Sequence, residues 1–244
     1  MALPTMKIAT HELTVPSTGQ KVEFRPFLVK EEKAMLMAVE DGSPKALTNA
    51  MKNIITACTN GDIDLKTLAS FDFEYIFLQL RGKSVGDVVE LHLKKPEQIT
   101  CEDNGCPKAS QIEVDIRDIE MDISKIEKPE IELTDEIGIK LNFPDLELVQ
   151  KFIKPGGDLA TNDIFNLINE CIEYIWDEEE IYKAKDTTKK ELDEFIESLS
   201  SIQFAKIKDF LEGMPTLRHE VIWKCSKCER QAPILLEGID AFFE

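Results

Sequence analysis

The sequence predicts an α+β fold: a helical body with β-hairpins and a zinc-ribbon-like pair of cysteine knuckles. Two observations lead to this prediction. Stretches in which apolar and polar residues alternate, as they do in strands, lie towards both ends of the chain and around two cysteine pairs. Stretches with apolar residues three and four positions apart, as in helices, lie between them. At 244 residues the chain is long enough for one large domain or two small ones.

The N-terminal part begins with a predicted hairpin and continues into helices. Residues 11–15 and 21–25 alternate on either side of a Pro-Ser-Thr-Gly turn. Helices are predicted over residues 30–40 and, with Ser43 as the N-cap, over residues 44–59. The apolar positions of these two helices are Ala34, Met35, Met37, Ala38, Leu47, Met51, Ile54, Ile55 and Cys58.

Residues 71–80 are dense in aromatic and aliphatic side chains. The 3-and-4 spacing of these side chains favours a helix capped by Ser70 over the competing strand. The next four residues, Arg81-Gly82-Lys83-Ser84, look like the end of a phosphate-binding loop. Phe77 stands where that motif needs a glycine, so no nucleotide site is expected.

The middle of the chain is expected to hold a strand and connector over 117–134, a strand over 137–143 and a short helix over 145–153. The loop Lys154-Pro155-Gly156-Gly157 is the clearest break in the chain. We therefore expect two parts, an N-terminal α+β part over residues 1–154 and a helical part over residues 155–244.

The second part opens with a predicted helix that is capped by Asn162 and continues to Trp176, because its apolar residues form a wide stripe. The acidic run at residues 177–180 is interpreted as a solvated loop, because consecutive carboxylates splay apart. Two capping boxes, Thr188-x-x-Glu191 and Ser200-x-x-Gln203, predict the N-termini of two further helices.

Four of the six cysteines form two pairs, and each pair lies at the tip of a predicted hairpin. The first pair is Cys101 and Cys106, and the second is Cys225 and Cys228. The flanking strands are predicted at residues 88–93, 111–116, 219–223 and 233–236. Zn²⁺ takes four ligands in a tetrahedron, with thiolate sulfur at about 2.3 Å. The pairs therefore predict one structural zinc site, and four cysteines leave no open position for a catalytic water.

Two disulfides or four unrelated thiols are the alternatives for these cysteines. The N-terminus lacks the apolar core of a signal peptide, so the protein is expected in a cytosol, where paired cysteines more often bind metal. No apolar run is long enough to cross a membrane. The remaining cysteines, Cys58 and Cys171, fall on apolar helix faces and are expected in the core.

Composition and missing motifs narrow the function classes. The chain has 29 basic and 47 acidic residues, a net charge of −18, and its basic residues are scattered. This balance argues against nucleic-acid binding and favours a basic protein partner, although simple solubility accounts for it equally well. No metalloprotease, serine-hydrolase or dinucleotide motif occurs, so no catalysis is expected. His92 and His219 lie in predicted strands and are expected to be ordinary strand residues. Because they precede the two cysteine pairs, hydrogen bonds near the metal are the alternative.

Several strings, in order along the chain, carry a resemblance to a known family. They include Phe24-Arg25-Pro26-Phe27-Leu28-Val29-Lys30-Glu31-Glu32-Lys33, Leu80-Arg81-Gly82-Lys83-Ser84-Val85-Gly86 and Met214-Pro215-Thr216-Leu217-Arg218-His219-Glu220-Val221. Together they resemble the baseplate hub subunit family of T-even-type contractile-tailed phages, over nearly the whole chain.

The resemblance implies a non-enzymatic phage protein that acts in assembly of the baseplate central hub by binding other tail or hub proteins. It implies assembly in the host cytoplasm and leaves open whether the protein stays in the virion tail baseplate. One alternative is a tail-assembly chaperone for the tape-measure protein that is absent from the mature virion. Another is a zinc-ribbon nucleic-acid regulator, against which the net charge speaks. The terminal Phe242-Phe243 is a candidate apolar contact for a partner.

Overall fold

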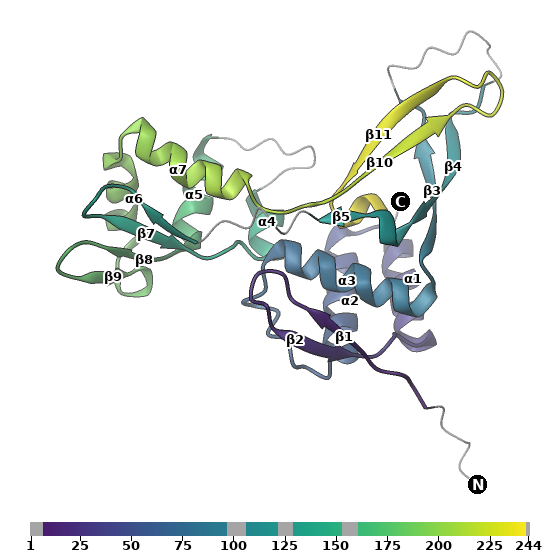
Figure 1. The fold of residues 1–244 in the computed structure, drawn as a ribbon, viewed down its shortest axis with the longest axis horizontal. Coiled ribbons are helices and arrows are strands. Elements are labelled where there is room, and N and C mark those ends of the chain that lie inside the picture. The colour runs from purple at the N-terminus through teal and green to yellow at the C-terminus, as the bar shows by residue number, and fades with distance from the viewer. Residues whose placement is uncertain (1–6, 97–105, 122–128, 153–160, 243–244) are drawn as a thin grey trace. The chain divides into compact units, whose positions relative to one another are not determined.

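The fold is mixed helix and small antiparallel sheets, which confirms the predicted α+β class (Figure 1). The structure is a computed structural model, and it describes residues 7–96, 106–121, 129–152 and 161–242. The chain divides into two compact units. Unit 1 comprises Met1–Leu65, Glu74–Asp122 and Thr216–Glu244, and unit 2 comprises Lys66–Phe73 and Ile123–Pro215. Among the described residues, no helix combines the length and the apolar character that a membrane span needs.

The described residues of unit 1 form three α-helices and three small sheets, which include two hairpins that carry cysteines. The first hairpin, residues 11–24, and the next two helices form where their sequence patterns predict them. The elements of unit 1 are β1 (His11–Thr14), β2 (Lys21–Phe24), α1 (Val29–Asp41), α2 (Pro44–Cys58), most of α3 (Ser70–Val85), β3 (Val88–Lys94), β4 (Ala109–Asp115), η1 (Ile116–Asp118), β5 (Glu120–Met121), β10 (Leu217–Lys224), β11 (Gln231–Glu237) and η4 (Ile239–Phe242).

Helix α1 buries a narrower face than its sequence predicts. Met35 and Ala38 are buried, whereas Ala34 is exposed and Met37 is 59% exposed, so the predicted stripe was wrong at two of its four positions. The third inward residue is Glu31, which the sequence pattern does not mark as buried. Glu31 accepts hydrogen bonds from Arg25 Nη2 and from the Leu28 backbone N–H, both at 2.9 Å, so its charge is satisfied inside.

Helices α2 and α3 follow their predictions closely. Ser43 is the N-cap of α2 and Pro44 its first residue, a position where the missing N–H of proline costs no hydrogen bond. Helix α3 begins at Ser70 and runs past residue 80, so the string that looks like a phosphate loop is part of a helix. A helical backbone cannot wrap its N–H groups around a phosphate, and the rejection of a nucleotide site is consistent with this geometry.

In the described part of unit 2, four helices pack on one face of a four-stranded antiparallel sheet with the order β6-β7-β8-β9. Its core includes Ile139, Leu167, Cys171 and Ile207. The elements of unit 2 are β6 (Glu130–Glu132), β7 (Gly138–Leu141), α4 (Leu146–Phe152), α5 (Thr161–Cys171), β8 (Ile172–Trp176), β9 (Ile181–Lys183), η3 (Ala184–Asp186), α6 (Lys189–Ser198) and α7 (Ser201–Glu212).

The predicted helix from Asn162 to Trp176 was wrong over its last third. Helix α5 ends at Cys171, and β8 follows directly and pairs with β7 on one side and β9 on the other. Residues 172–176 are two isoleucines, a tyrosine, a tryptophan and one glutamate, and such residues favour a strand when neighbours pair with both edges. The helical periodicity continued by chance across the boundary, while partners distant in sequence decided the conformation.

Both predicted capping boxes are formed. Thr188 and Glu191 exchange side-chain and backbone hydrogen bonds at the start of α6, and Ser200 and Gln203 do the same at the start of α7. The expected division at residues 154 and 155 falls within a segment outside the described residues. The two compact units differ from that division, since the C-terminal hairpin belongs to unit 1 and residues 123–152 belong to unit 2.

Candidate metal centre

Two hairpins of unit 1 carry the cysteine pairs and contact each other. The Ser110 side chain on β4 donates a hydrogen bond to the Lys224 carbonyl at the end of β10, at 2.9 Å. The Trp223 indole N–H donates to the Leu93 carbonyl on β3 at 3.3 Å, and Trp223 is fully buried. A buried indole needs such a partner, so this contact fixes β10 against β3 where both strands approach their tips.

The tip of the β10–β11 hairpin is a tight turn that begins at Cys225. The Cys225 N–H donates to the Arg230 carbonyl at 2.9 Å, and the Glu229 N–H donates back to the Cys225 carbonyl at 3.0 Å. Glu229 has a φ of 59°, the left-handed conformation in which such a turn closes. The turn therefore brings Cys228 back beside Cys225.

Three of the four predicted ligands come together. The sulfur atoms of Cys106, Cys225 and Cys228 all lie within 4.8 Å of one another, although Cys106 is more than a hundred residues away in sequence. Thiolates about 2.3 Å from one tetrahedral ion would lie roughly 3.8 Å apart. The three sulfur atoms would therefore have to move only slightly closer together to bind one metal ion. None of these three cysteines forms a disulfide. Cys101, the fourth predicted ligand, lies outside the described residues.

Cys225 is prepared to act as a thiolate. Hydrogen bonds from the backbone of Cys228 and then of Lys227 lower the pKa of the Cys225 thiol to about 6, with further contributions from the Cys228 and Cys106 side chains. Each of these donors stabilises negative charge on the sulfur. The thiolate is the form that binds metals, so this turn favours a metal at neutral pH.

The other two cysteines lie in apolar cores, as predicted. Cys58 and Cys171 are both buried. Burial raises the pKa of Cys58 to about 11 and that of Cys171 to about 12, because the apolar surroundings disfavour the charged thiolate. Among the described residues, neither cysteine belongs to a group of possible metal ligands, and the surroundings of both fit core packing.

The two strand histidines occupy different surroundings. Nδ1 of His219 lies 3.0 Å from the Asp118 carbonyl, so this ring nitrogen is held by η1. His92 is exposed in the middle of β3, opposite Gln111. His219 was the wrong candidate, because it lies six positions before Cys225 along an extended strand, roughly 20 Å away. A hydrogen bond from His92 to a cysteine stays a prediction.

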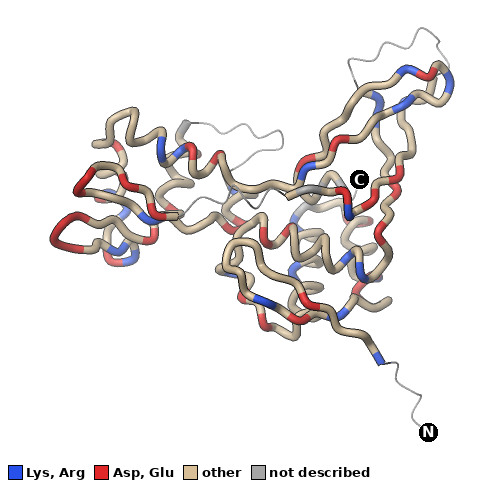
Figure 2. The backbone as a smooth tube through the Cα atoms, viewed as in Figure 1, with Lys and Arg blue, Asp and Glu red and all other residues tan. Residues whose placement is uncertain are grey.

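The acidic run at residues 177–180 forms the turn between β8 and β9, which confirms the solvated-loop interpretation. The Asp177 carboxylate accepts hydrogen bonds from the backbone N–H groups of Glu179 and Glu180 at 2.9 and 2.8 Å. These bonds come first among the causes that lower the pKa of Asp177. Figure 2 shows the acidic residues of this turn in red.

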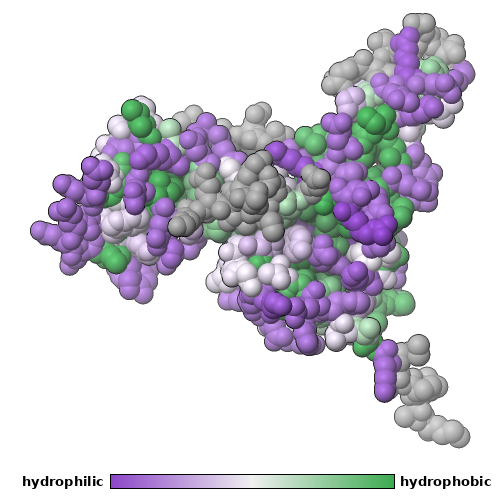
Figure 3. Space-filling view, viewed as in Figure 1, coloured by the Kyte–Doolittle hydropathy of each residue, from purple (hydrophilic) through white to green (hydrophobic). Residues whose placement is uncertain are grey.

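Unit 1 also presents an apolar groove of about 240 Å³, which sequence patterns did not reveal. Leu36 and Val39 of α1 and Val85 of α3 line it, and they are 58%, 46% and 54% exposed. In the space-filling view, hydrophobic patches interrupt a largely hydrophilic surface (Figure 3). The sequence does contain a sign of this groove, because Leu36 and Val39 form a second apolar face of α1 that the single predicted stripe did not include.

Comparisons with known proteins identify the relatives of this chain. The model of the T4 bacteriophage base plate protein family matches residues 8–244. The baseplate hub assembly protein gp26 of Enterobacteria phage T4 is 26% identical over 227 residues, which cover 93% of this chain and 94% of the relative. No solved structure matches.

Proposed function

Because the chain belongs to the T4 bacteriophage base plate protein family, we propose that it acts in assembly of the baseplate central hub by binding other baseplate proteins. The observation that carries this proposal is the family match over residues 8–244, together with full-length similarity to a relative that is named a hub assembly protein. No reaction is proposed, because the sequence contains no catalytic motif.

The surface of the chain supports a binding role. Exposed apolar side chains gather on α1 and at the end of α3, and solvent-exposed apolar patches commonly mark protein contacts. The net charge of −18 would repel nucleic acid and attract a basic partner. A protein with this role either stays in the hub of the finished virion or leaves before the virion is complete.

We also propose that Cys101, Cys106, Cys225 and Cys228 hold one structural zinc ion. The clustering of three thiols and the lowered pKa of Cys225 support it. Zinc would join the tips of β3–β4 and β10–β11, and metal binding of this kind stabilises the folded state directly. A site filled by four thiolates has no position for a substrate, so its role would be structural.

The test is co-expression of the chain with the hub proteins and the tape-measure protein of the same virus, followed by co-purification at low and high salt. Retention of a hub protein is the expected result. Mass spectrometry of purified virions then shows whether the chain stays in the baseplate. Retention of the tape-measure protein alone, with absence from virions, would replace the hub role with the chaperone role. Binding of DNA or RNA without any tail protein would overturn both.

A further inference from the structure

The β6–β9 sheet of unit 2 has one face on the core and an outer face that is not part of it. Ile139 of β7 and Ile175 of β8 are register partners and both are buried. Side chains alternate along a strand, so the residues on either side of these two point outwards. Register therefore places Glu132, Gly138, Trp176 and Ile181 in one outer row, and Glu130, Lys140, Tyr174 and Lys183 in the next.

Gly138 makes room for an aromatic platform on this face. A Cβ on Gly138 would lie 2.0 Å from Cζ2 of Trp176, so the indole lies directly over the glycine backbone. The Tyr174 ring lies beside it, with ring centroids 5.9 Å apart, and its hydroxyl donates to Glu130 at 2.9 Å. Both rings are half-buried and Ile181 beside them is 60% exposed, so the platform is fixed from below and open above.

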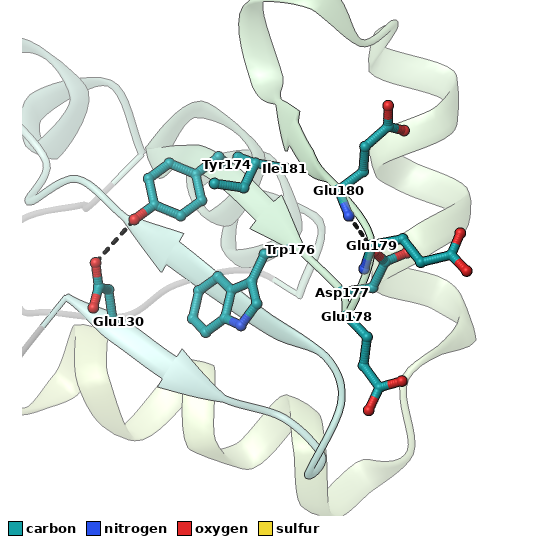
Figure 4. Close-up of a pocket in the computed structure, with 8 residues that line it drawn as sticks. All are labelled: Glu130, Tyr174, Trp176, Asp177, Glu178, Glu179, Glu180 and Ile181. Carbon is teal, nitrogen blue, oxygen red and sulfur yellow. Dashed lines mark hydrogen bonds between the residues drawn. The ribbon is translucent and has the colours of Figure 1, made fainter.

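The platform lines a hollow of about 550 Å³, shown in Figure 4. Every charged side chain that lines it is acidic: Glu130, Asp177, Glu178, Glu179 and Glu180. Glu130 and Asp177 are held by Tyr174 and by the turn, whereas the other three carboxylates form no hydrogen bond or ion pair with the described residues. Figure 4 shows those three pointing in different directions, so they do not converge on one metal ion.

We propose that this outer face is the docking site for an arginine- or lysine-bearing segment of a baseplate partner protein. An aromatic face attracts a cation, and tryptophan does so most strongly. A guanidinium or ammonium group above Trp176 would lie in the negative potential that the three carboxylates of the adjoining turn create. Ile181 offers apolar contact to the stem of the same side chain. The partner being a baseplate protein rests on the proposed function, whereas its basic character rests on this surface alone.

The two lysines on this face, Lys140 and Lys183, do not neutralise the acidic side chains that line the hollow. Lys140 lies 5.3 Å from the Tyr174 ring centroid, but its ammonium is paired with Glu173 at 3.1 Å. Lys183 is the other outer cation, and it belongs to the edge strand β9. Neither residue lines the hollow. A basic segment would therefore meet uncompensated negative charge there.

The experiment uses the full chain and short overlapping peptides that cover the baseplate proteins of the same virus. Binding is read from tryptophan fluorescence, which reports mainly Trp176 because Trp223 is fully buried. The variants are Trp176→Leu and the triple substitution Glu178→Gln, Glu179→Gln and Glu180→Gln. The matched control is Glu194→Gln, Glu197→Gln and Glu212→Gln, which removes three exposed charges from α6 and α7 of the same unit.

The expected result is that the bound peptides carry arginine or lysine. Removal of three negative charges from the turn beside Trp176 is expected to weaken binding about tenfold, while the control triple leaves it unchanged. Trp176→Leu lacks the fluorophore, so its binding is measured by calorimetry, and a loss of about tenfold is expected. Binding of peptides without basic residues, no peptide binding, or equal weakening by both triples would overturn the site.

Co-purification separates this proposal from the proposed function. If a hub protein is retained equally by wild type and by the acidic-turn triple, the hub role stands and this docking site is wrong. If no baseplate protein is retained but basic peptides still bind at Trp176, the site stands and the hub role is wrong.

Discussion

Glu31 is a buried acid that helps to hold the start of α1, and it makes the stability of unit 1 depend on pH. Its side chain is 8% exposed and pairs with Arg25 at 2.9 Å. Desolvation raises its pKa, but the hydrogen bonds from Arg25, Leu28 and Lys30 outweigh that effect, and the net pKa is lowered. Leu28 has no side-chain acceptor, so Glu31 supplies only the reciprocal half of a capping box.

We predict that Glu31→Gln lowers the free energy of unfolding by about 2 kcal/mol at neutral pH, because a charged hydrogen bond is lost and Arg25 keeps a buried charge. A lowered folded-state pKa stabilises the protein above the unfolded pKa, near 4.5, and loses this effect as the pH falls through the folded value. Urea unfolding at neutral and acidic pH measures this. A difference between variant and wild type that persists undiminished well below pH 4.5 would contradict it.

The cysteines differ in their surroundings, and this difference makes the proposed zinc site testable. Cys225→Ser should abolish zinc binding, since it removes the thiol with the lowered pKa, and elemental analysis should change from about one zinc per chain to none. Cys58→Ser is the control, because that thiol lies in an apolar core and its raised pKa keeps it protonated. Equal zinc loss in both variants would show that the ligands are misassigned.

At the scale of elements, the position of the Trp176 ring depends on one glycine in β7, Gly138. Gly138→Ala places a Cβ within 2.4 Å of three indole atoms, so the ring has to leave its position. We expect a loss of about 1–3 kcal/mol in unfolding free energy and a shift in tryptophan emission as the ring moves into water. Gly82→Ala is the matched control, since its Cβ would meet nothing closer than 3.4 Å within a helix. An unchanged emission spectrum in Gly138→Ala would show that the Trp176 indole does not need the space over Gly138.

The elements also show which local signals predict a structure. The two capping boxes were predicted and are formed, because each is complete within four residues. The cysteine turn at residues 225–228 was equally local. The strand at 172–176 was missed because its conformation depends on β7 and β9. The docking face was missed for the same reason, since it needs the register that aligns Gly138 with Trp176.

At the scale of the whole molecule, the order of the chain does not follow its compact units. Residues 216–237 return to unit 1 after about ninety residues that belong to unit 2. A break such as the Lys154–Gly157 loop is visible in sequence, but the return of a distant hairpin leaves no local trace. The paired cysteines were the exception, because a shared metal requires Cys106 and Cys225 to meet. A chemical demand therefore predicted a long-range contact that periodicity could not.

The placement of the cysteines predicts that metal removal acts on one unit. All four proposed ligands belong to unit 1. The one cysteine in the sequence of unit 2 is Cys171, which is buried in its core and protonated at neutral pH. Chelation under reducing conditions should therefore increase hydrogen exchange in β3, β4, β10 and β11, while Ile139, Leu167 and Ile207 keep their protection. Hydrogen–deuterium exchange with mass spectrometry resolves these segments.

The control for this experiment is Cys225→Ser, in which the same chelator should have no further effect because no metal is bound. Loss of protection throughout both units would mean that they unfold together. Unchanged protection in the β3–β4 and β10–β11 hairpins would mean that the thiol cluster holds no structural metal. The hydrogen bonds of Trp223 and Ser110, which join β10 to β3 and β4 without any ion, would then contribute to holding the hairpins together.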